Sequence, residues 1–197
     1  MNDFWNQRYK TKEYAYGELP NLYFKKELEK LIPGIILLPG EGEGRNAVFA
    51  ASKGWDVTAF DPSTEGRKKA LLLAENHNVK INYLIESYET ADFNKDSFDC
   101  IGLIYTHMSL EKRKEYHRKL LSFLNPGGIL ILEGFSKQQI NKNTGGPRNI
   151  EMLFSKDELL DDFSGLKDIK IEERDTRLNE GSFHQGVASV IRLVGTK

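Results

Sequence analysis

The chain has 197 residues, with 28 basic and 29 acidic side chains and a formal net charge of −1. This length predicts one domain with a core large enough to fold without disulfide bonds. The single cysteine, Cys100, excludes a disulfide framework and a cysteine-rich zinc module, and the balanced charge argues against a protein that binds nucleic acid mainly by electrostatics.

The first residues contain neither the basic nor the apolar region of a signal peptide. No apolar run approaches the ~20 residues that a membrane span requires. We therefore expect a cytoplasmic protein with no membrane or nucleic-acid partner, present as a monomer or a homodimer.

Short apolar runs alternate with amphipathic segments over the first two thirds of the chain. The predicted strands are 35–38, 56–60, 80–85, 98–105 and 129–133, and the predicted helices are 43–53, 64–76 and 110–124. Continuous apolar runs are typical of parallel strands buried on both faces. The alternation of such runs with helices predicts a parallel sheet with crossover helices.

The pattern changes after the fifth predicted strand. Residues 135–154 are polar and Gly-rich, and we expect an ordered loop over a site, because a free loop of this length is uncommon in a compact domain. A short helix at 155–163 precedes two strands, 168–177 and 186–195, that are close enough to pair antiparallel. The predicted fold class is α/β, a Rossmann-like doubly wound sheet with one antiparallel strand near the C-terminus.

Three alternating glycines follow the first predicted strand. Gly40, Gly42 and Gly44 let the backbone turn tightly and approach a ligand closely. Asp61 ends the next strand about twenty residues later, where a carboxylate accepts hydrogen bonds from both hydroxyls of a ribose. Together these features indicate a cofactor that contains a nucleoside; a turn that binds nothing is the alternative.

Two kinds of cofactor fit this pattern, and the charges of the glycine-rich segment distinguish between them. Glu41 and Glu43 would oppose the pyrophosphate of a dinucleotide, at about 1 kcal/mol or more per close pair, but they suit the cationic sulfonium and ammonium of S-adenosylmethionine. The chain also leaves little length for the separate substrate domain of a dehydrogenase. None of its eight tyrosines is followed by a lysine four positions later, as the short dehydrogenases require. We therefore favour S-adenosylmethionine.

The segments 40–47 (GEGEGRNA) and 54–61 (GWDVTAFD) resemble the class I S-adenosylmethionine-dependent methyltransferases, in particular the tellurite-resistance and thiopurine methyltransferase-like branch. The resemblance extends over nearly the whole chain and includes 124–128 (LNPGG) and the tyrosine-rich segment 14–21. It implies a single methyltransferase domain over 1–197 with a seven-stranded sheet. It also implies that 1–30 covers the cofactor and that 135–154 lies over the acceptor site.

The resemblance also implies a set of cofactor-binding residues. These are Tyr14, Tyr16, Gly40, Glu41, Gly42, Gly44, Asn46, Asp61, Ser87, Tyr88 and Tyr105. The glycines would line the methionine part, Asp61 would hold the ribose, and Ser87 and Tyr88 would lie near the adenine amino group. Tyr14 and Tyr16 either close over the sulfonium with their ring faces or only pack the amino-terminal segment.

Two positions depart from the family pattern. Pro39 replaces an acidic residue often found before the first glycine, which moves the contact with the cofactor's amino end to Glu41 or to a water. At the adenine site Ser87 stands where the family has an acid, and Glu86 is adjacent to it. The sequence therefore leaves both residues as candidates for recognising the adenine base.

Three residues are candidates for catalytic roles on the acceptor side: His107, Arg148 and His184. His107 orients or deprotonates an acceptor or is hydrogen-bonded to a loop carbonyl. Arg148 attracts an anionic substrate or is an exposed surface residue, and His184 faces the acceptor cavity or lies outside it. Methyl transfer mainly requires alignment in a dry site, and a general base is needed only when the acceptor arrives protonated.

The remaining histidines and basic residues indicate no further chemistry. The four histidines lack metal-ligand spacing, so no metal site is expected. His77 and His117 are expected on helix surfaces, and the basic run at 112–119 as a solvated helix face. The sequence thus predicts a methyltransferase for a small-molecule acceptor, with a thiol or a chalcogen oxyanion such as tellurite favoured. The alternatives are a methyltransferase acting on a protein or RNA partner and a cofactor-binding module without turnover.

Overall fold

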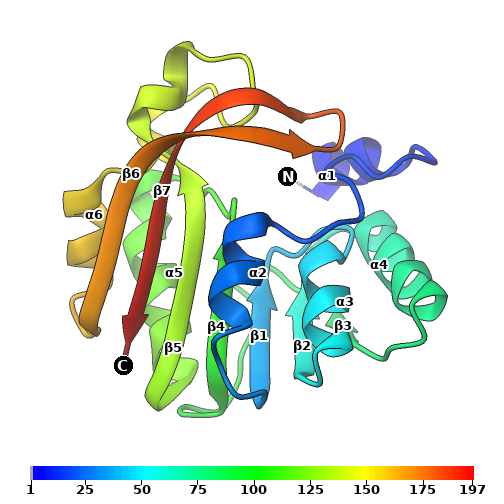
Figure 1. The fold of residues 1–197 in the computed structure, drawn as a ribbon, viewed down its shortest axis with the longest axis horizontal. Coiled ribbons are helices and arrows are strands. Elements are labelled where there is room, and N and C mark those ends of the chain that lie inside the picture. The colour runs from blue at the N-terminus through cyan, green and yellow to red at the C-terminus, as the bar shows by residue number, and fades with distance from the viewer. Residues whose placement is uncertain (1) are drawn as a thin grey trace.

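The computed structural model describes residues 2–197, apart from the side chain of Asn2, so the first residue of the predicted domain, Met1, lies outside the described residues. A seven-stranded sheet with the order β3-β2-β1-β4-β5-β7-β6 forms the centre of the molecule (Figure 1). Its strands are β1 (Ile35–Pro39), β2 (Asp56–Phe60), β3 (Asn82–Leu84), β4 (Phe98–Ile104), β5 (Leu124–Phe135), β6 (Lys167–Glu180) and β7 (His184–Thr196). Among the described strands, β7 is antiparallel to both of its neighbours, β5 and β6, and the pairs from β3 to β5 are parallel, which confirms the predicted fold class.

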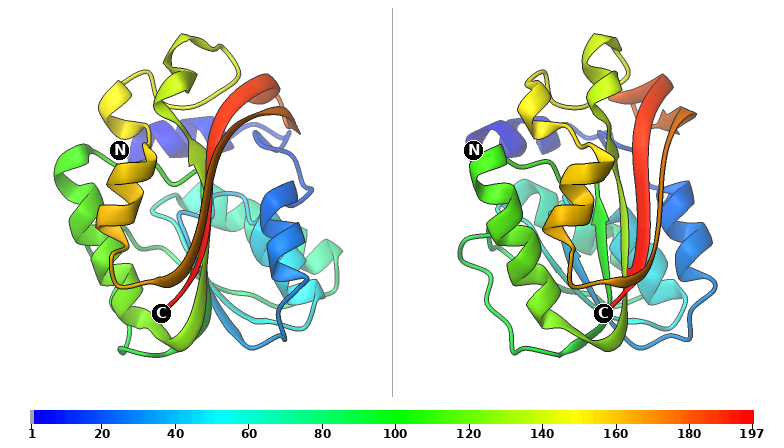
Figure 2. Two further views of the ribbon diagram at one scale, coloured as in Figure 1. Left: turned by 60° about the vertical axis from the view of Figure 1, so that its left-hand side comes forward. Right: turned by 90° about the vertical axis from the view of Figure 1, so that its left-hand side faces the viewer.

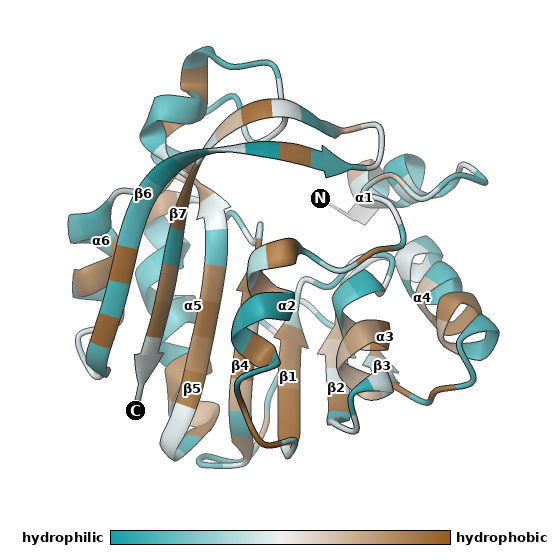
Figure 3. Ribbon diagram, viewed as in Figure 1, coloured by the Kyte–Doolittle hydropathy of each residue, from teal (hydrophilic) through white to brown (hydrophobic). Residues whose placement is uncertain are grey.

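Helices cover both faces of the sheet (Figure 2). They are α1 (Asn2–Tyr9), α2 (Leu22–Leu28), α3 (Arg45–Ser52), α4 (Thr64–Asn76), α5 (Leu110–Phe123) and α6 (Lys156–Asp162), with two short 3-10 helices, Lys137–Asn141 and Ile150–Met152. The apolar strands β1, β4 and β5 lie between the two helix layers, as their hydropathy requires (Figure 3). No helix in the described residues is long and apolar enough to cross a membrane.

The carboxyl ends of the strands are covered by two elements. The β6–β7 hairpin is longer than predicted and arches over this edge of the sheet (Figure 1). At its tip the Phe183 amide donates to the Ala15 carbonyl at 3.4 Å, so the hairpin meets the segment that follows α1. A ligand at this edge therefore lies beneath a roof made from both ends of the chain.

The predicted solvated face of α5 is wrong at two positions. Arg113 and His117 are buried, and both donate to the Asp162 carboxylate of α6, from Nε at 2.7 Å and Nδ1 at 2.8 Å. The sequence showed only a basic helix, because the partner carboxylate lies more than forty residues away. These contacts fix α6 against α5.

Candidate active site

The glycine loop, residues 40–44, connects β1 to α3. Gly40 and Gly42 have φ angles of 63° and 62°, in the left-handed region that favours glycine. A Cβ at Gly40 would lie 2.6 Å from Tyr88 Oη, and one at Gly42 would lie 2.6 Å from Tyr9 Oη. Both conformation and space therefore exclude side chains at Gly40 and Gly42.

Asp61 follows β2 beside the glycine loop. Its carboxylate accepts the Ser63 amide at 2.8 Å, and the residue is only 5% exposed. Burial raises the pKa of Asp61 to about 6, although backbone hydrogen bonds from Ser63 and Gly42 oppose this rise. In the described part of the chain no lysine or arginine lowers this pKa. Such a carboxylate suits the two hydroxyls of a ribose, which donate hydrogen bonds without adding charge.

Two buried hydroxyls face the same loop without partners. The hydroxyl of Tyr88 and the methyl group of Thr106 lie beside Gly40, and neither Tyr88 Oη nor Thr106 Oγ1 makes a hydrogen bond of good geometry within residues 2–197. Buried polar atoms are nearly always hydrogen-bonded in native proteins. The two hydroxyls therefore suit the polar groups of a ligand bound at the loop.

The two glutamates of the loop point in different directions. Glu41 accepts two amides of the first turn of α3, including that of Asn46 at 2.7 Å, and burial raises the pKa of Glu41 to about 7. Glu43 instead forms an ion pair with Lys69 at 2.6 Å. The sequence analysis favoured a cationic cofactor because both residues are acidic. Since Lys69 pairs with Glu43, this preference now rests on Glu41 alone.

The tyrosines of the amino-terminal segment divide between three places. Tyr9, from α1, covers the glycine loop. The Tyr14 hydroxyl donates to the Lys69 carbonyl at 3.0 Å, which places this side chain on α4. The Tyr16 ring lies against the His184 ring, with centroids 4.5 Å apart.

Ser87 and Tyr88 follow β3 but have different surroundings. Ser87 forms a turn in which its amide donates to Thr90 Oγ1 at 3.0 Å. The Tyr88 ring packs edge-on against Phe60, with centroids 5.5 Å apart. Tyr88 is the member of the pair whose hydroxyl reaches the glycine loop.

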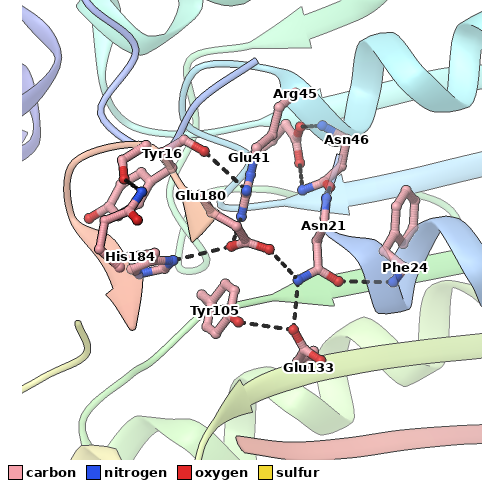
Figure 4. Close-up of polar contacts among 12 residues, drawn as sticks. Tyr16, Asn21, Phe24, Glu41, Arg45, Asn46, Tyr105, Glu133, Glu180 and His184 are labelled. Carbon is pink, nitrogen blue, oxygen red and sulfur yellow. Dashed lines mark hydrogen bonds and ion pairs between the residues drawn. The ribbon is translucent and has the colours of Figure 1, made fainter. Parts of the chain in front are cut away.

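A buried glutamate holds His184 at the hairpin tip (Figure 4). Glu180 Oε2 accepts from His184 Nδ1 at 3.3 Å and from Arg45 Nη2 at 2.9 Å, while Oε1 accepts from Asn21 Nδ2 at 3.0 Å. Burial tends to raise the pKa of Glu180, but the His184 hydrogen bond and the Arg45 charge lower it to about 2. Because the ionised carboxylate can only accept, Nδ1 of His184 carries the proton.

The other ring nitrogen of His184, Nε2, makes no hydrogen bond in the part of the chain that is described. Burial lowers the pKa of His184, with opposition from the Glu180 carboxylate, so the ring is neutral at pH 7. A neutral imidazole with an unused Nε2 lone pair is the form that accepts a proton.

A second buried carboxylate, Glu133 at the end of β5, extends this cluster. Glu133 Oε1 accepts from Asn21 Nδ2 at 2.6 Å and from Tyr105 Oη at 2.9 Å, and Oε2 accepts from Arg192 Nε. Tyr105 has a φ of 56°, which is uncommon for a residue other than glycine and frequent at functional sites. Asn21 therefore bridges the two carboxylates, Glu133 and Glu180 (Figure 4).

His107 has both ring nitrogens engaged. Nδ1 donates to the Met152 carbonyl at 2.7 Å, and Nε2 accepts the Phe135 amide at 3.0 Å. Burial lowers the pKa of His107 to about 4, so the neutral tautomer joins the ends of β4 and β5 to the loop above them. This geometry leaves no nitrogen of His107 available to an acceptor.

Arg148 lies on the outer surface of the loop 135–154, where Nη2 donates to Asn143 Oδ1 at 3.1 Å. Two glycines of this loop face inward instead. A Cβ at Gly145 would lie 2.6 Å from the His184 ring, and one at Gly146 would lie 2.8 Å from the Phe135 ring. The loop thus contacts His184 and Phe135 through its backbone.

Comparison with known proteins assigns the central part of the chain. Residues 36–128, which include the glycine loop and Asp61, match the family described as "Methyltransferase domain". The matched segment is just under half of the chain. The cofactor that such a domain implies is S-adenosylmethionine. The Asp61 carboxylate, which lacks a lysine or arginine partner among the described residues, and the buried hydroxyls of Tyr88 and Thr106 fit its ribose and its other polar groups.

Curated relatives match about half of the chain. The ubiquinone biosynthesis O-methyltransferase of Rickettsia typhi is 28% identical over 102 residues, 52% of this chain and 41% of the relative. The corresponding protein of Rickettsia canadensis is 29% identical over 104 residues, 53% of this chain and 44% of the relative. The aligned region thus spans less than half the length of these relatives.

Solved structures share the fold of this chain over its whole length. A structure from a study of the conversion of a disulfide bond into a thioacetal group during echinomycin biosynthesis has a TM-score of 0.80 and 16% identity, and the match covers 100% of this chain and 91% of that one. TehB from Haemophilus influenzae has a TM-score of 0.74 and 16% identity, with coverage of 100% and 66%.

The sequence did not identify several residues of the candidate site: Tyr9, Asn21, Arg45, Glu133 and Glu180. Two signals were present for them. Glu133 is a charged residue at the end of an apolar strand, and Trp5 and Tyr9 have the i,i+4 spacing of a helix face. Asn21, Arg45 and Glu180 are ordinary polar residues in sequence, and only the fold shows that they meet.

Proposed function

We propose that this chain is an S-adenosylmethionine-dependent methyltransferase that acts on a small molecule. The observation that carries the proposal is a continuous path of hydrogen bonds from the cofactor loop to His184. Asn46, which donates to Glu41, accepts the Asn21 amide at 2.9 Å, and Asn21 donates to Glu180, the partner of His184. A loop suited to a nucleoside is thereby joined to a neutral imidazole.

Each part of the site has a role in this proposal. Gly40, Gly42 and Gly44 line the methionine part of the cofactor, Asp61 accepts from the ribose hydroxyls, and Glu41 faces the cationic amino end. Tyr88, with Ser87 nearby, lies on the adenine side. When bound, the cofactor supplies a methyl group attached to a sulfonium, which is a good leaving group.

His184 serves as the general base for an acceptor that arrives protonated. Its Nε2 would take the acceptor's proton during methyl transfer, and Glu180 would hold the ring and stabilise the imidazolium that forms. The proton would then pass from Nε2 to solvent. In this proposal His107 and Tyr105 help to form the walls of the acceptor site beside His184.

The acceptor classes favoured by the sequence, a thiol or a chalcogen oxyanion, both remain within this proposal, as does the tellurite-resistance branch. The fold similarity to TehB supports the branch, and the O-methyltransferase relatives add a hydroxyl as a third nucleophile. A base with an unused lone pair favours the protonated classes, the thiol and the hydroxyl, because an oxyanion needs no base.

The roof over the site favours a small acceptor over the protein or RNA partner of the alternative interpretation. The hairpin tip meets the amino-terminal segment at Ala15, and the opening beside them has a volume of about 280 Å³. A nucleic acid or a folded protein would need this contact to separate.

The test is transfer of a labelled methyl group from S-adenosylmethionine to small thiols and phenols, with the variant His184→Gln and the control Ile32→Ala, a residue 90% exposed on the surface. The proposal expects His184→Gln to lower kcat by 10²-fold or more while the S-adenosylhomocysteine affinity is unchanged. The wild-type rate should fall on acidification with an apparent pKa below 6.5, because burial lowers that of His184. Cofactor binding without transfer to any acceptor would favour a binding module without turnover.

A further inference from the structure

The side chain of Asn21 lies between two buried carboxylates (Figure 4). Its Nδ2 donates to Glu133 Oε1 at 2.6 Å and to Glu180 Oε1 at 3.0 Å, and Asn21 and Glu133 are each 1% exposed. The second oxygen of each carboxylate, Oε2, is paired with an arginine, Arg192 or Arg45. The two Oε1 atoms therefore face one neutral amide, which separates like charges that would otherwise repel each other in a place with little water.

The other polar groups of Asn21 fix the orientation of this amide. Oδ1 accepts the Phe24 amide at 2.9 Å and so caps α2, while the backbone amide donates to Asn46 Oδ1 at 2.9 Å. Since an ionised carboxylate only accepts and a backbone amide only donates, these partners determine which end of the side chain carries the nitrogen. Asn21 thus has two roles that substitution can separate: a helix cap through its oxygen and a bridge through its nitrogen.

The bridge orients the carboxylate that holds His184. Glu180 accepts from Asn21 through Oε1, and it accepts from His184 Nδ1 and Arg45 through Oε2, so both of its oxygens are engaged. The hydrogen bond that one ring nitrogen makes decides which nitrogen of a histidine carries the proton. While Glu180 is ionised and held in this way, the proton stays on Nδ1 and the lone pair on Nε2.

The titratable and charged groups around His184 come from several elements. They are Glu180 of β6, Glu133 of β5, Arg45 of α3, His107, Tyr16 and Tyr105. Burial lowers the pKa of His184 most strongly, and the hydrogen bond and charge of Glu180 oppose this effect. Within the described residues Glu180 is the group of this set that is hydrogen-bonded to the His184 ring, so a change at Glu180 acts on the ring directly.

We propose that Asn21 is a positioning residue for the base: its side-chain amide holds Glu133 and Glu180 ionised side by side and so keeps His184 in the tautomer whose Nε2 can take a proton. This inference rests on the proposed function only for the use of that lone pair. The bridge joins the residue before α2 to the ends of β5 and β6, three parts of the chain that are far apart in sequence.

Asn21→Asp separates the two roles, because aspartate caps helices as well as asparagine does but lacks the N–H groups of the bridge. The new carboxylate would lie between two others, and three close carboxylates do not all stay ionised, so the cluster should bind an additional proton near neutral pH. This proton is shared between the carboxylates and the imidazole. The apparent pKa of His184 should therefore rise by about 1, measured by NMR titration of the labelled histidine rings.

The control for the added charge is Asn125→Asp. Asn125 Nδ2 also donates to a carboxylate, Asp99 Oδ1 at 2.8 Å, but this pair lies where β4 and β5 begin, at the opposite edge of the sheet. The substitution likewise places a carboxylate beside a carboxylate, and it should leave the His184 titration unchanged.

Asn21→Ser tests the bridge without added charge. Serine also caps helices, but its shorter side chain does not reach the two glutamates. We expect the share of molecules with the His184 proton on Nδ1 to fall, as seen in the ring nitrogen chemical shifts. We also expect kcat to fall about tenfold at an unchanged Kd for S-adenosylhomocysteine, since one hydrogen bond to a charged group is lost.

The NMR measurements use the purified chain and need no acceptor. A wild-type His184 titration in Asn21→Asp, or a wild-type tautomer in Asn21→Ser, would overturn the proposal and leave Asn21 as a helix cap alone. The serine variant decides the question if the charged variant does not fold. Absence of methyl transfer by the wild-type chain would instead refute the proposed function, and the effect of the bridge on His184 would stand.

Discussion

Replacement of Asp61 by asparagine should separate cofactor binding from stability, because it weakens cofactor binding and leaves the stability equal to or above that of the wild type. The carboxylate is 5% exposed, and burial raises its pKa from 3.8 to about 6. An acid whose pKa is raised on folding destabilises the folded state as the pH rises from 3.8 to 6, by ~3 kcal/mol for a shift of about two units. At pH 7 the whole of this cost is present in the wild-type protein without cofactor.

Asp61→Asn removes this charge but also removes one acceptor for the backbone amides of Ser63 and Gly42. The loss of an acceptor costs about 1–3 kcal/mol, so the two terms roughly cancel, and we expect a Tm equal to or above that of the wild type. Cofactor affinity should fall, because a hydrogen bond to a charged group contributes about 1.5–3 kcal/mol and one of the two ribose contacts is lost. The expected increase in the Kd for S-adenosylhomocysteine is roughly 10- to 100-fold.

The assay is isothermal titration of both proteins with S-adenosylhomocysteine, combined with thermal unfolding at pH 7. Asp56→Asn is the matched control, because Asp56 is exposed at the other end of the same strand, and it should change neither quantity. An unchanged Kd in Asp61→Asn with an intact Tm would refute the assignment of Asp61 to the ribose. A large drop in Tm would refute the argument that its buried charge is unfavourable.

Two further predictions concern two glycines with similar φ angles and the buried ion pair between α5 and α6. Gly42→Ala should abolish measurable S-adenosylhomocysteine binding, because its Cβ would meet Tyr9. Gly127→Ala has a similar φ of 82° and open space around it, so it should cost only about 1 kcal/mol of stability and leave binding intact. Equal losses of binding in the two variants would contradict this prediction. Asp162→Asn should lower the free energy of unfolding, measured in urea, by about 3 kcal/mol, because it removes the closer of the two carboxylates paired with the buried Arg113 charge and leaves only Glu158 at 3.5 Å. A loss below about 1 kcal/mol would show that the pair is unimportant.

Local patterns predicted the sheet and the glycine loop well, because their signals lie within a few residues of one another. The apolar run at 35–38, the alternating glycines after it and Asp61 at the end of the next strand each occur in one short segment, and the structure places the strands and the loop accordingly. The helices α1 and α2 were not predicted. They have 8 and 7 residues, which is about two turns and too short for a clear helical period.

The acceptor side could not be derived from the sequence, because its contacts join distant segments. Asn21 and Glu180 are 159 residues apart, and Arg45 and Glu180 are 135 apart. The same limitation explains why His117 was expected on a surface and is buried, since Asp162 binds it across 45 residues. For His107 and His184 the sequence left two roles open, and the difference lies in a single unused ring nitrogen that only the fold reveals.

The most direct test of the central claim is calorimetric titration of the purified chain with S-adenosylhomocysteine, with NAD as a parallel control. The account predicts one binding site for S-adenosylhomocysteine and no heat of binding for NAD, because the loop at 40–44 holds Glu41 where a pyrophosphate would lie. Binding of NAD alone, or of neither compound, would contradict it.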